Sequence, residues 1–137
     1  MRFIIMVKAT ADSEAGKKPA QALLASMATY HEALQKAGVL LDASGLQSSA
    51  KGWRVHYANG EQTMTEGPFA DTEELIAGYT VIQVRSREEA MEWSRRFPAP
   101  FGENGDGEIE VRQMMDLDDF EPGQSMERFR KIEGANH

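Results

Sequence analysis

The hydrophobic pattern of the chain contains two segments that are apolar on both sides, residues 2–8 and residues 75–84. Successive side chains of a strand point to opposite faces, so each segment predicts a strand that is buried on both faces of a sheet. Residues 39–46 and 108–115 have weaker apolar patterns that predict two further strands. The two strands with apolar residues on both sides are expected in the middle of the sheet.

Two helices are predicted between these strands. The first begins near Pro19 and ends at Gly38, because proline suits a first helical turn and glycine suits a helix end. Its apolar residues recur at helical spacing, at Leu23, Met27, Tyr30 and Leu34. The second helix begins at Ser86, whose spacing from Glu89 is that of a capping box, and it ends at Pro98.

A β-hairpin is predicted between the second and third strands of the sheet. Residues 53–57 and 62–65 are separated by a turn that contains Asn59-Gly60, a strong short-range hairpin signal. Residues 10–18 are small and polar and predict a loop. The order of elements is strand, helix, strand, inserted hairpin, strand, helix, strand, which predicts an α+β fold, a ferredoxin-like βαββαβ sandwich.

Two helices can cover only one face of such a sheet, so its second face needs a cover of its own. We expect a second copy of the chain to supply that cover. A monomer whose N-terminal strand folds back over the sheet is the alternative. Beyond Asp116 the chain is acidic and polar, with a weak apolar pattern at Met126, Phe129 and Ile132. This tail is either a short docking helix or disordered.

The composition is that of one soluble globular domain, with 137 residues, 41% of them hydrophobic and 27% charged. A net charge of −7 argues against a nucleic-acid partner, because affinity for phosphates comes from Lys and Arg. No apolar segment reaches the roughly 18 to 20 residues that span a bilayer, and no signal-peptide pattern is present. We therefore expect a cytoplasmic protein with no membrane partner. The absence of cysteine excludes disulfides, thiolate metal sites and cysteine nucleophiles.

Residues 66–74, Glu-Gly-Pro-Phe-Ala-Asp-Thr-Glu-Glu, form the most informative stretch of the chain. Pro68 fixes its own φ and Gly67 can adopt dihedrals closed to other residues, so the chain bends here in one way. This bend can direct the carboxylates of Glu66 and Asp71 to a common space. Solvation of an acidic turn is the alternative role for Asp71.

His31 is the candidate proton-transfer group, because it lies at the margin of the apolar stripe of the first helix. From there its imidazole can reach the cleft between helix and sheet and exchange protons near neutral pH. A boundary histidine with a structural role is the alternative that the residues alone favour. The three histidines lack the spacing of a zinc site, and no glycine-rich loop opens a helix, so neither a metal nor a cofactor is expected.

The stretch resembles the signature of the DGPF branch of the YCII-related superfamily, in which Asp-Gly-Pro-Phe precedes an acidic, threonine-containing run and a Gly-aromatic strand. Here Glu66 replaces the Asp, and Gly78-Tyr79 supplies the strand. The resemblance spans about residues 1–120, leaves 121–137 as a tail, and implies a dimeric α+β barrel. It also implies an active site formed by a helix histidine and the acidic residue of the motif, matched by His31 and Glu66.

Other site roles follow from the same resemblance. The family has an arginine in its last strand, matched by Arg112, which would pair with Glu66 or an anionic ligand. A structural salt bridge is the alternative for Arg112. Asp71 and Phe69 are further candidates for substrate binding, although a core plug is the more frequent role for such a phenylalanine.

Three classes of function are compatible with these observations. The first is a small-molecule-binding protein or cofactor-independent enzyme that transfers protons through His31 and Glu66. The second is an interaction module, since some DGPF-domain proteins are associated with extracytoplasmic-function sigma factors. The third is a monooxygenase-like barrel, since related dimeric barrels oxidise aromatic substrates or bind haem. An inward His31 beside a carboxylate would favour the first class, an exposed apolar patch the second, and a porphyrin-sized pocket the third.

Overall fold

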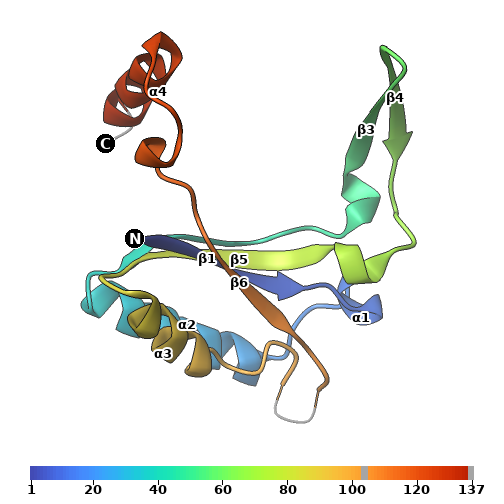
Figure 1. Cartoon of the computed structure of the whole chain (residues 1–137). Coiled ribbons are helices and arrows are strands. Elements are labelled where there is room, and N and C mark those ends of the chain that lie inside the picture. The colour runs from blue at the N-terminus through green and yellow to red at the C-terminus, as the bar shows by residue number, and fades with distance from the viewer. Residues whose placement is uncertain (103–104, 136–137) are drawn as a thin grey trace.

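A computed structural model describes residues 1–102 and 105–135 and shows an antiparallel sheet with helices on one face (Figure 1). The strands of this sheet are β1 (Arg2–Lys8), β2 (Leu40–Gly45), β5 (Ile76–Gln83) and β6 (Ile109–Gln113). They lie in the order β2-β5-β1-β6, with every pair antiparallel. The predicted ferredoxin-like α+β fold is confirmed, and both strands with apolar residues on both sides lie in the middle of the sheet.

Two helices, α2 (Gln21–Lys36) and α3 (Arg87–Arg95), cover the same face of the sheet (Figure 1). The chain leaves α2 through Gly38, whose φ of 75° is accessible to glycine at little cost. The Ser86 hydroxyl oxygen accepts the backbone N–H of Glu89 at 3.1 Å at the start of α3. Both predicted helices are therefore confirmed, together with the residues expected to end the first and begin the second.

The core lies between the sheet and these helices. Three side chains are fully enclosed there, Ile5 from β1, Leu34 from α2 and Ile82 from β5. Each contributes roughly 1.5–3 kcal/mol to stability through the apolar surface it buries. The Tyr30 hydroxyl donates a hydrogen bond to the carbonyl oxygen of Trp93 at 2.7 Å, which ties α2 to α3. The core also includes Phe3, Val39, Val84 and Ala90.

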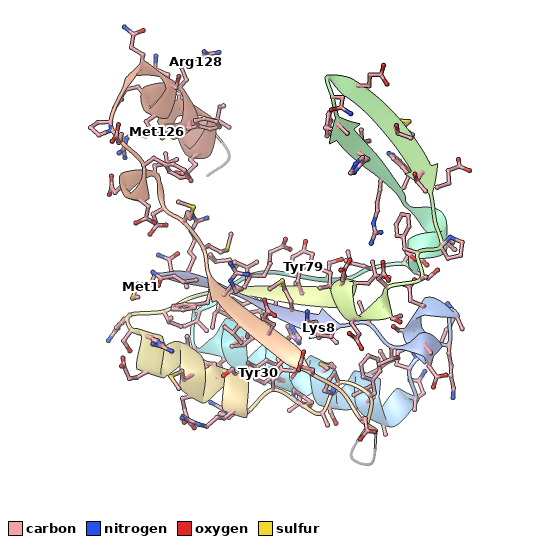
Figure 2. The ribbon with its side chains drawn as sticks, turned by 45° about the vertical axis from the view of Figure 1, so that its right-hand side comes forward. Met1, Lys8, Tyr30, Tyr79, Met126 and Arg128 are labelled. Carbon is pink, nitrogen blue, oxygen red and sulfur yellow. The ribbon has the colours of Figure 1, made fainter. Side chains whose placement is uncertain are left out.

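The other face of the sheet is open in the part of the chain that the structure describes (Figure 1). Since Ile5 points toward the helices, the alternating neighbours Ile4 and Met6 point to the open face, where they pair with Val81 and Tyr79. Figure 2 shows Tyr79 on this side and Tyr30 on the helix side. Charged residues border the apolar centre, namely Lys8, Glu110, Arg112 and Asp42. The prediction that helices cover one face only is confirmed.

Two arms rise from opposite ends of the sheet on its open side (Figure 1). One arm is the hairpin of β3 (Trp53–Ala58) and β4 (Glu61–Glu66), whose turn residues Asn59 and Gly60 have φ values of 53° and 76°. Two consecutive positive φ values are those of the predicted Asn-Gly hairpin turn. The other arm is the helix α4 (Gln124–Ala135).

The tail and the first loop differ in part from their predictions. The tail is helical over α4, and residues 136–137 of it lie outside the described residues. The predicted loop over residues 10–18 contains a short helix, α1 (Ala11–Glu14), because Thr10 and Ser13 form a capping box at its start. Within residues 1–102 and 105–135, none of the helices has the length and apolar character needed to span a membrane.

Candidate functional site

His31 points from α2 toward β5 and both nitrogens of its ring are engaged. Nδ1 lies 2.7 Å from the carbonyl oxygen of Met27, and Nε2 lies 2.8 Å from the hydroxyl oxygen of Thr80. A carbonyl oxygen can only accept, so Nδ1 carries the hydrogen. In the neutral ring Nε2 therefore holds a lone pair that accepts the hydrogen of the Thr80 hydroxyl. These two contacts select one tautomer of His31.

Local structure explains why this imidazole is held so closely. Met27 precedes His31 by one helical turn, which places its carbonyl below the ring. Thr80 lies on the helix-facing side of β5, opposite Ile5, and is only 2% exposed. The edges of the ring meet Tyr30 and Phe97, with centroid distances of 5.5 and 6.4 Å. In such an enclosed setting an unmade hydrogen bond is costly, so the pair holds its geometry unless another donor takes the place of the Thr80 hydroxyl.

The Nε2 lone pair is the part of the ring that can accept a proton, and in the free chain the Thr80 hydroxyl donates to it. The predicted partner of His31 was the carboxylate of Glu66, whereas the observed partner is the hydroxyl of Thr80. A hydroxyl carries no charge at neutral pH, so it orients the ring without holding a proton on it electrostatically. Thr80 was not among the residues that the sequence pointed to.

Glu66 lies elsewhere in the chain. It ends β4, pairs with Trp53 across the hairpin, and is exposed on the arm. Among the described residues, no hydrogen bond or ion pair joins it to His31. One chain by itself therefore does not bring the two residues together, and their convergence stays a prediction for the assembled protein.

The Gly-Pro-Phe turn is anchored by a cluster that the sequence analysis missed. The Glu14 carboxylate accepts the backbone N–H of Ser49 at 2.9 Å and also its hydroxyl hydrogen. The Ser49 hydroxyl oxygen in turn accepts the backbone N–H of Phe69 at 2.9 Å. A Cβ on Gly67 would collide with the backbone carbonyl of Ser49, so only glycine fits there. Because Glu14 and Ser49 lie far apart in sequence, no motif spacing could have revealed the cluster.

Of the other predicted site residues, Phe69 and Asp71 lie in the segment between β4 and β5, and Arg112 lies on β6. Phe69 is half-buried, and the guanidinium of Arg54 stacks 4.0 Å from its ring centroid. Asp71 is exposed in the loop before β5. Arg112 lies on the open face and pairs with Glu110 at 3.5 Å, so it is separated from His31 by the sheet. This pairing is the salt bridge that was considered as the alternative for Arg112.

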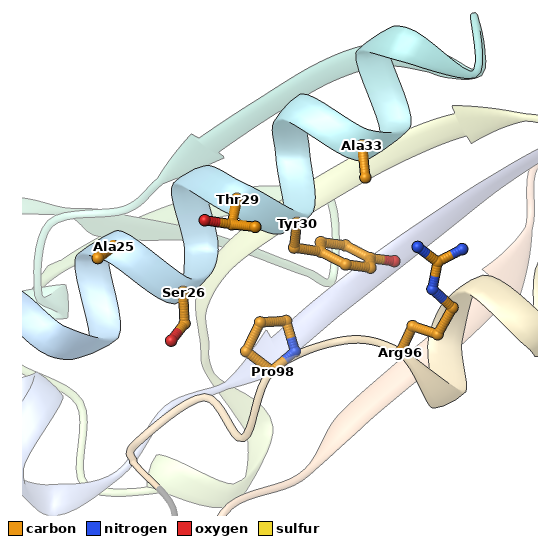
Figure 3. Close-up of a pocket in the computed structure, with 7 residues that line it drawn as sticks. All are labelled: Ala25, Ser26, Thr29, Tyr30, Ala33, Arg96 and Pro98. Carbon is orange, nitrogen blue, oxygen red and sulfur yellow. The ribbon is translucent and has the colours of Figure 1, made fainter.

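A shallow groove of about 440 Å³ runs between α2 and the segment after α3 (Figure 3). It is lined by Ala25, Ser26, Thr29, Tyr30, Ala33, Arg96 and Pro98. Ser26 and Tyr30 donate their hydroxyl hydrogens to backbone carbonyl oxygens. The Arg96 guanidinium lies 4.2 Å from the Trp93 ring centroid. Burial raises the pKa of Tyr30 to about 12, which keeps its phenol protonated. Tyr30 lines this groove, whereas its neighbour His31 does not.

Comparison with known proteins identifies the family. A family model described as YCII-related domain matches residues 1–118 of the chain. The chain belongs to the YCII-related family. It is also similar to the structure of 5-chloro-2-hydroxyhydroquinone dehydrochlorinase (TftG) from Burkholderia phenoliruptrix AC1100 in complex with 2,5-dihydroxybenzoquinone. That similarity has 16% sequence identity and a TM-score of 0.46, and it covers 84% of this chain and 94% of that chain. No curated protein matches the chain.

Membership of the YCII-related family confirms the resemblance that the Glu-Gly-Pro-Phe stretch carries. In this YCII-related chain, the described residues contain no group of three or more His, Asp or Glu side chains arranged to hold a metal ion. The side chains with the best-defined chemical geometry are His31 and Thr80, with the rings of Tyr30 and Phe97 beside them.

Proposed function

We propose that the chain is a homodimeric small-molecule-binding protein in which His31 transfers a proton on a bound organic ligand. The observation that carries the proposal is the single tautomer of His31. Met27 accepts the Nδ1 hydrogen, so the lone pair is at Nε2, the nitrogen that faces the sheet. Family membership supports a small-molecule-binding or enzymatic role of this kind.

The surroundings of His31 favour a flat, weakly acidic ligand. The rings of Tyr30 and Phe97 stand edge-on to the imidazole and offer an aromatic wall. A ligand O–H that displaces the Thr80 hydroxyl hydrogen from Nε2 would donate to the same lone pair. The proton would then move from the ligand to Nε2, giving an imidazolium and a ligand anion. The hydroxyl oxygen of Thr80 would accept the new Nε2 hydrogen.

The homodimer is supported by the open face of the sheet. Ile4, Met6, Val81 and Tyr79 lie at its centre, and one chain supplies no described element that covers them. Burial of such a face against a second copy is the arrangement by which sheets pack face to face. Arg112, on the same face, then belongs to the contact between copies.

Nitrogen-resolved NMR of the histidine rings, with phenol and catechol as probes, tests the proposal. We expect a probe to shift the Nε2 resonance of His31 and the amide of Thr80, and to leave His56 unchanged. His56 is the matched control because it is exposed on the hairpin arm. His31→Gln should abolish binding, whereas His56→Gln should preserve it. The proposal fails if both probes leave His31 unchanged, or if they bind His31→Gln as they bind the native chain.

A carboxylate variant addresses the predicted role of Glu66. If Glu66 assists His31 in the assembled protein, Glu66→Gln should weaken probe binding in the same assay. Asp71→Asn is the control for the loss of one exposed carboxylate from the same segment. Equal binding by Glu66→Gln and the native chain would remove Glu66 from the site and leave the role of His31 intact.

A further inference from the structure

The two arms expose apolar side chains on surfaces that the body of the chain does not cover. On the hairpin, the register of β3 with β4 places Trp53, Val55, Tyr57 and Met64 on one face, which we call the apolar hairpin face. Trp53, Tyr57 and Met64 are 64%, 69% and 70% exposed. Isolated surface hydrophobics are ordinary, but a cluster of this kind marks a contact surface.

The hairpin needs a contact to be stable. A two-stranded hairpin is at best marginally stable in water, because it has no sheet or helix to bury one of its faces. Its base is held by the Glu14–Ser49–Phe69 hydrogen bonds, while the strands beyond that base stand away from the sheet (Figure 2). A covering element is therefore expected over the apolar hairpin face.

The helix α4 has the complementary requirement. Met126, Phe129 and Ile132 recur at helical spacing on one side of it, and the last two are 51% and 56% exposed. Its main contacts are with the short helix η3 (Leu117–Asp119), through the Arg130–Asp118 ion pair at 2.7 Å. A 12-residue helix is only marginally stable by itself. Each arm thus presents an apolar surface that lacks a partner within the described chain.

Two-fold symmetry allows two limiting arrangements when two such sheets pack with their open faces together. An axis along the strands places each end of a sheet over the same end of the partner, so hairpin meets hairpin and α4 meets α4. An axis across the strands exchanges the ends, so each hairpin meets the α4 of the other copy. The arms lie at opposite ends of the sheet, which makes the two arrangements distinct (Figure 1).

Charge decides between these arrangements. Among the basic residues of α4, Arg130 is already paired with Asp118 of η3 and with Glu127. On the hairpin, the register places Glu66 on the apolar hairpin face beside Trp53, and it places Arg54 and Glu61 on the other face. Two hairpins packed together would bring Glu66 of one copy toward Glu66 of the other, whereas α4 offers the basic side chains of Arg128 and Lys131 to that carboxylate. Arg128 and Lys131 make no ion pair with other described residues, so they are available to a partner.

We propose that in the homodimer the apolar hairpin face of one copy packs against α4 of the other copy, so that both arms are exchanged. This inference rests on the homodimer of the proposed function and adds its orientation and the segments that form it. Glu66, which pairs with Trp53 and lies on the apolar hairpin face, then faces the basic residues Arg128 and Lys131 of α4. Glu66 becomes part of the contact between the copies.

Cross-linking of introduced thiols tests the exchange, because the native chain has no cysteine to interfere. Met64→Cys on the hairpin and Ile132→Cys on α4 replace exposed side chains and should leave the fold intact. The two variants are unfolded together, refolded as a mixture and treated with a short bis-maleimide. We expect cross-linked dimer from the mixture, several-fold more than from either variant alone. Met91→Cys on α3, mixed with Met64→Cys, is the control that should give none.

The other outcomes contradict the inference in different ways. Cross-linking of Met64→Cys with itself would support the axis along the strands and overturn the exchange. A mixture that stays uncross-linked although light scattering shows a dimer would overturn the exchange and leave the homodimer standing. A monomeric mass for the native chain would remove the homodimer and the exchange together.

A charge-reversal pair gives an independent readout of the same contact. Lys131→Glu should lower the yield of cross-linked dimer in the mixed experiment, because it brings like charges together. Adding Glu66→Lys on the hairpin should restore that yield, while the addition of Arg95→Glu, on α3, should not. Equal yields in all of these variants would contradict the proposed pairing of the arms.

Discussion

The two faces of the sheet differ in how much of their structure one chain completes. On the helix side, Ile5, Leu34 and Ile82 are fully enclosed, and the side chains of His31 and Thr80 form a hydrogen bond with each other. On the open side, none of the described helices covers Tyr79 and the neighbouring apolar residues, and two arms extend past them with exposed aromatic side chains. The difference teaches that one chain completes the helix side, whereas the open side is the face that the proposed second copy would cover.

The strongest test of this comparison places a charge on the helix side. Ile5→Glu buries an uncompensated carboxylate where the native side chain is 0% exposed. An unpaired buried charge costs about 3–5 kcal/mol, so we expect the free energy of unfolding to fall by that amount or the chain to unfold. Urea unfolding followed by circular dichroism measures the change. An unfolding midpoint equal to that of the native chain would contradict the assignment of Ile5 to the core.

The matched change on the open side should act on assembly instead of on folding. Val81 is the neighbour of Thr80 on β5 and points to the opposite face. Val81→Glu adds a charge that water can solvate in the monomer, so the circular dichroism spectrum should stay native. The same carboxylate would be desolvated between two copies, so the dimer should dissociate. Sedimentation velocity measures this loss, and a fully dimeric variant would place Val81 outside the interface.

A smaller effect is expected where the hairpin arm meets the body. Gly67→Ala forces a Cβ against the carbonyl of Ser49, an overpacking that costs about 1–3 kcal/mol. We expect the hairpin to loosen, with faster amide exchange in β3 and β4 measured by NMR. Gly45→Ala is the control, because a Cβ there meets nothing within 4 Å. Unchanged hairpin exchange in Gly67→Ala would show that the turn has room to adjust.

The smallest effect concerns Tyr30, which links the two helices. Tyr30→Phe removes the hydrogen bond to the Trp93 carbonyl and should lower stability by about 1 kcal/mol at neutral pH. Burial raises the pKa of Tyr30 from 10.0 to about 12 in the folded chain. The contribution of the protonated phenol is therefore fully present below pH 10 and is lost as the pH rises toward 12.

Unfolding measured at neutral and alkaline pH tests this dependence. The stability advantage of the native chain over Tyr30→Phe should shrink as the pH rises above 10. Other groups that titrate in this range are common to both proteins, so the difference isolates Tyr30. A constant difference across the alkaline range would contradict the buried position of the phenol.

Much of the fold could be predicted because it is encoded in local patterns. The strands with apolar residues on both sides, the Asn59-Gly60 turn and the Ser86 cap each express a short-range physical rule. The place of His31 at the margin of the helical stripe left open whether its ring points inward, and the residues alone favoured a structural role. The hydrogen-bond partner of His31 could not be predicted, because Thr80 lies 49 residues away along the chain, on a strand.

The anchoring of the Gly-Pro-Phe turn shows the same limit. Ser49 and Glu14 come together only when η1 (Ser49–Lys51) packs against α1, and no spacing in the sequence reports that contact. The pairing of Glu66 with His31 was expected by analogy with the family, and it stays a prediction for the assembled protein, because one chain holds Glu66 on the hairpin arm. Local rules therefore predicted the elements, and tertiary packing decided which side chains meet.

The mass of the native chain in solution tests the central claim that a second copy completes the open side. Light scattering at micromolar concentration should give twice the chain mass of 15.2 kDa. Dilution should lower the mass only well below that range, as expected for a large apolar interface. A stable mass of 15.2 kDa at micromolar concentration would contradict the account, because the open face and both arms would then be exposed in the working protein.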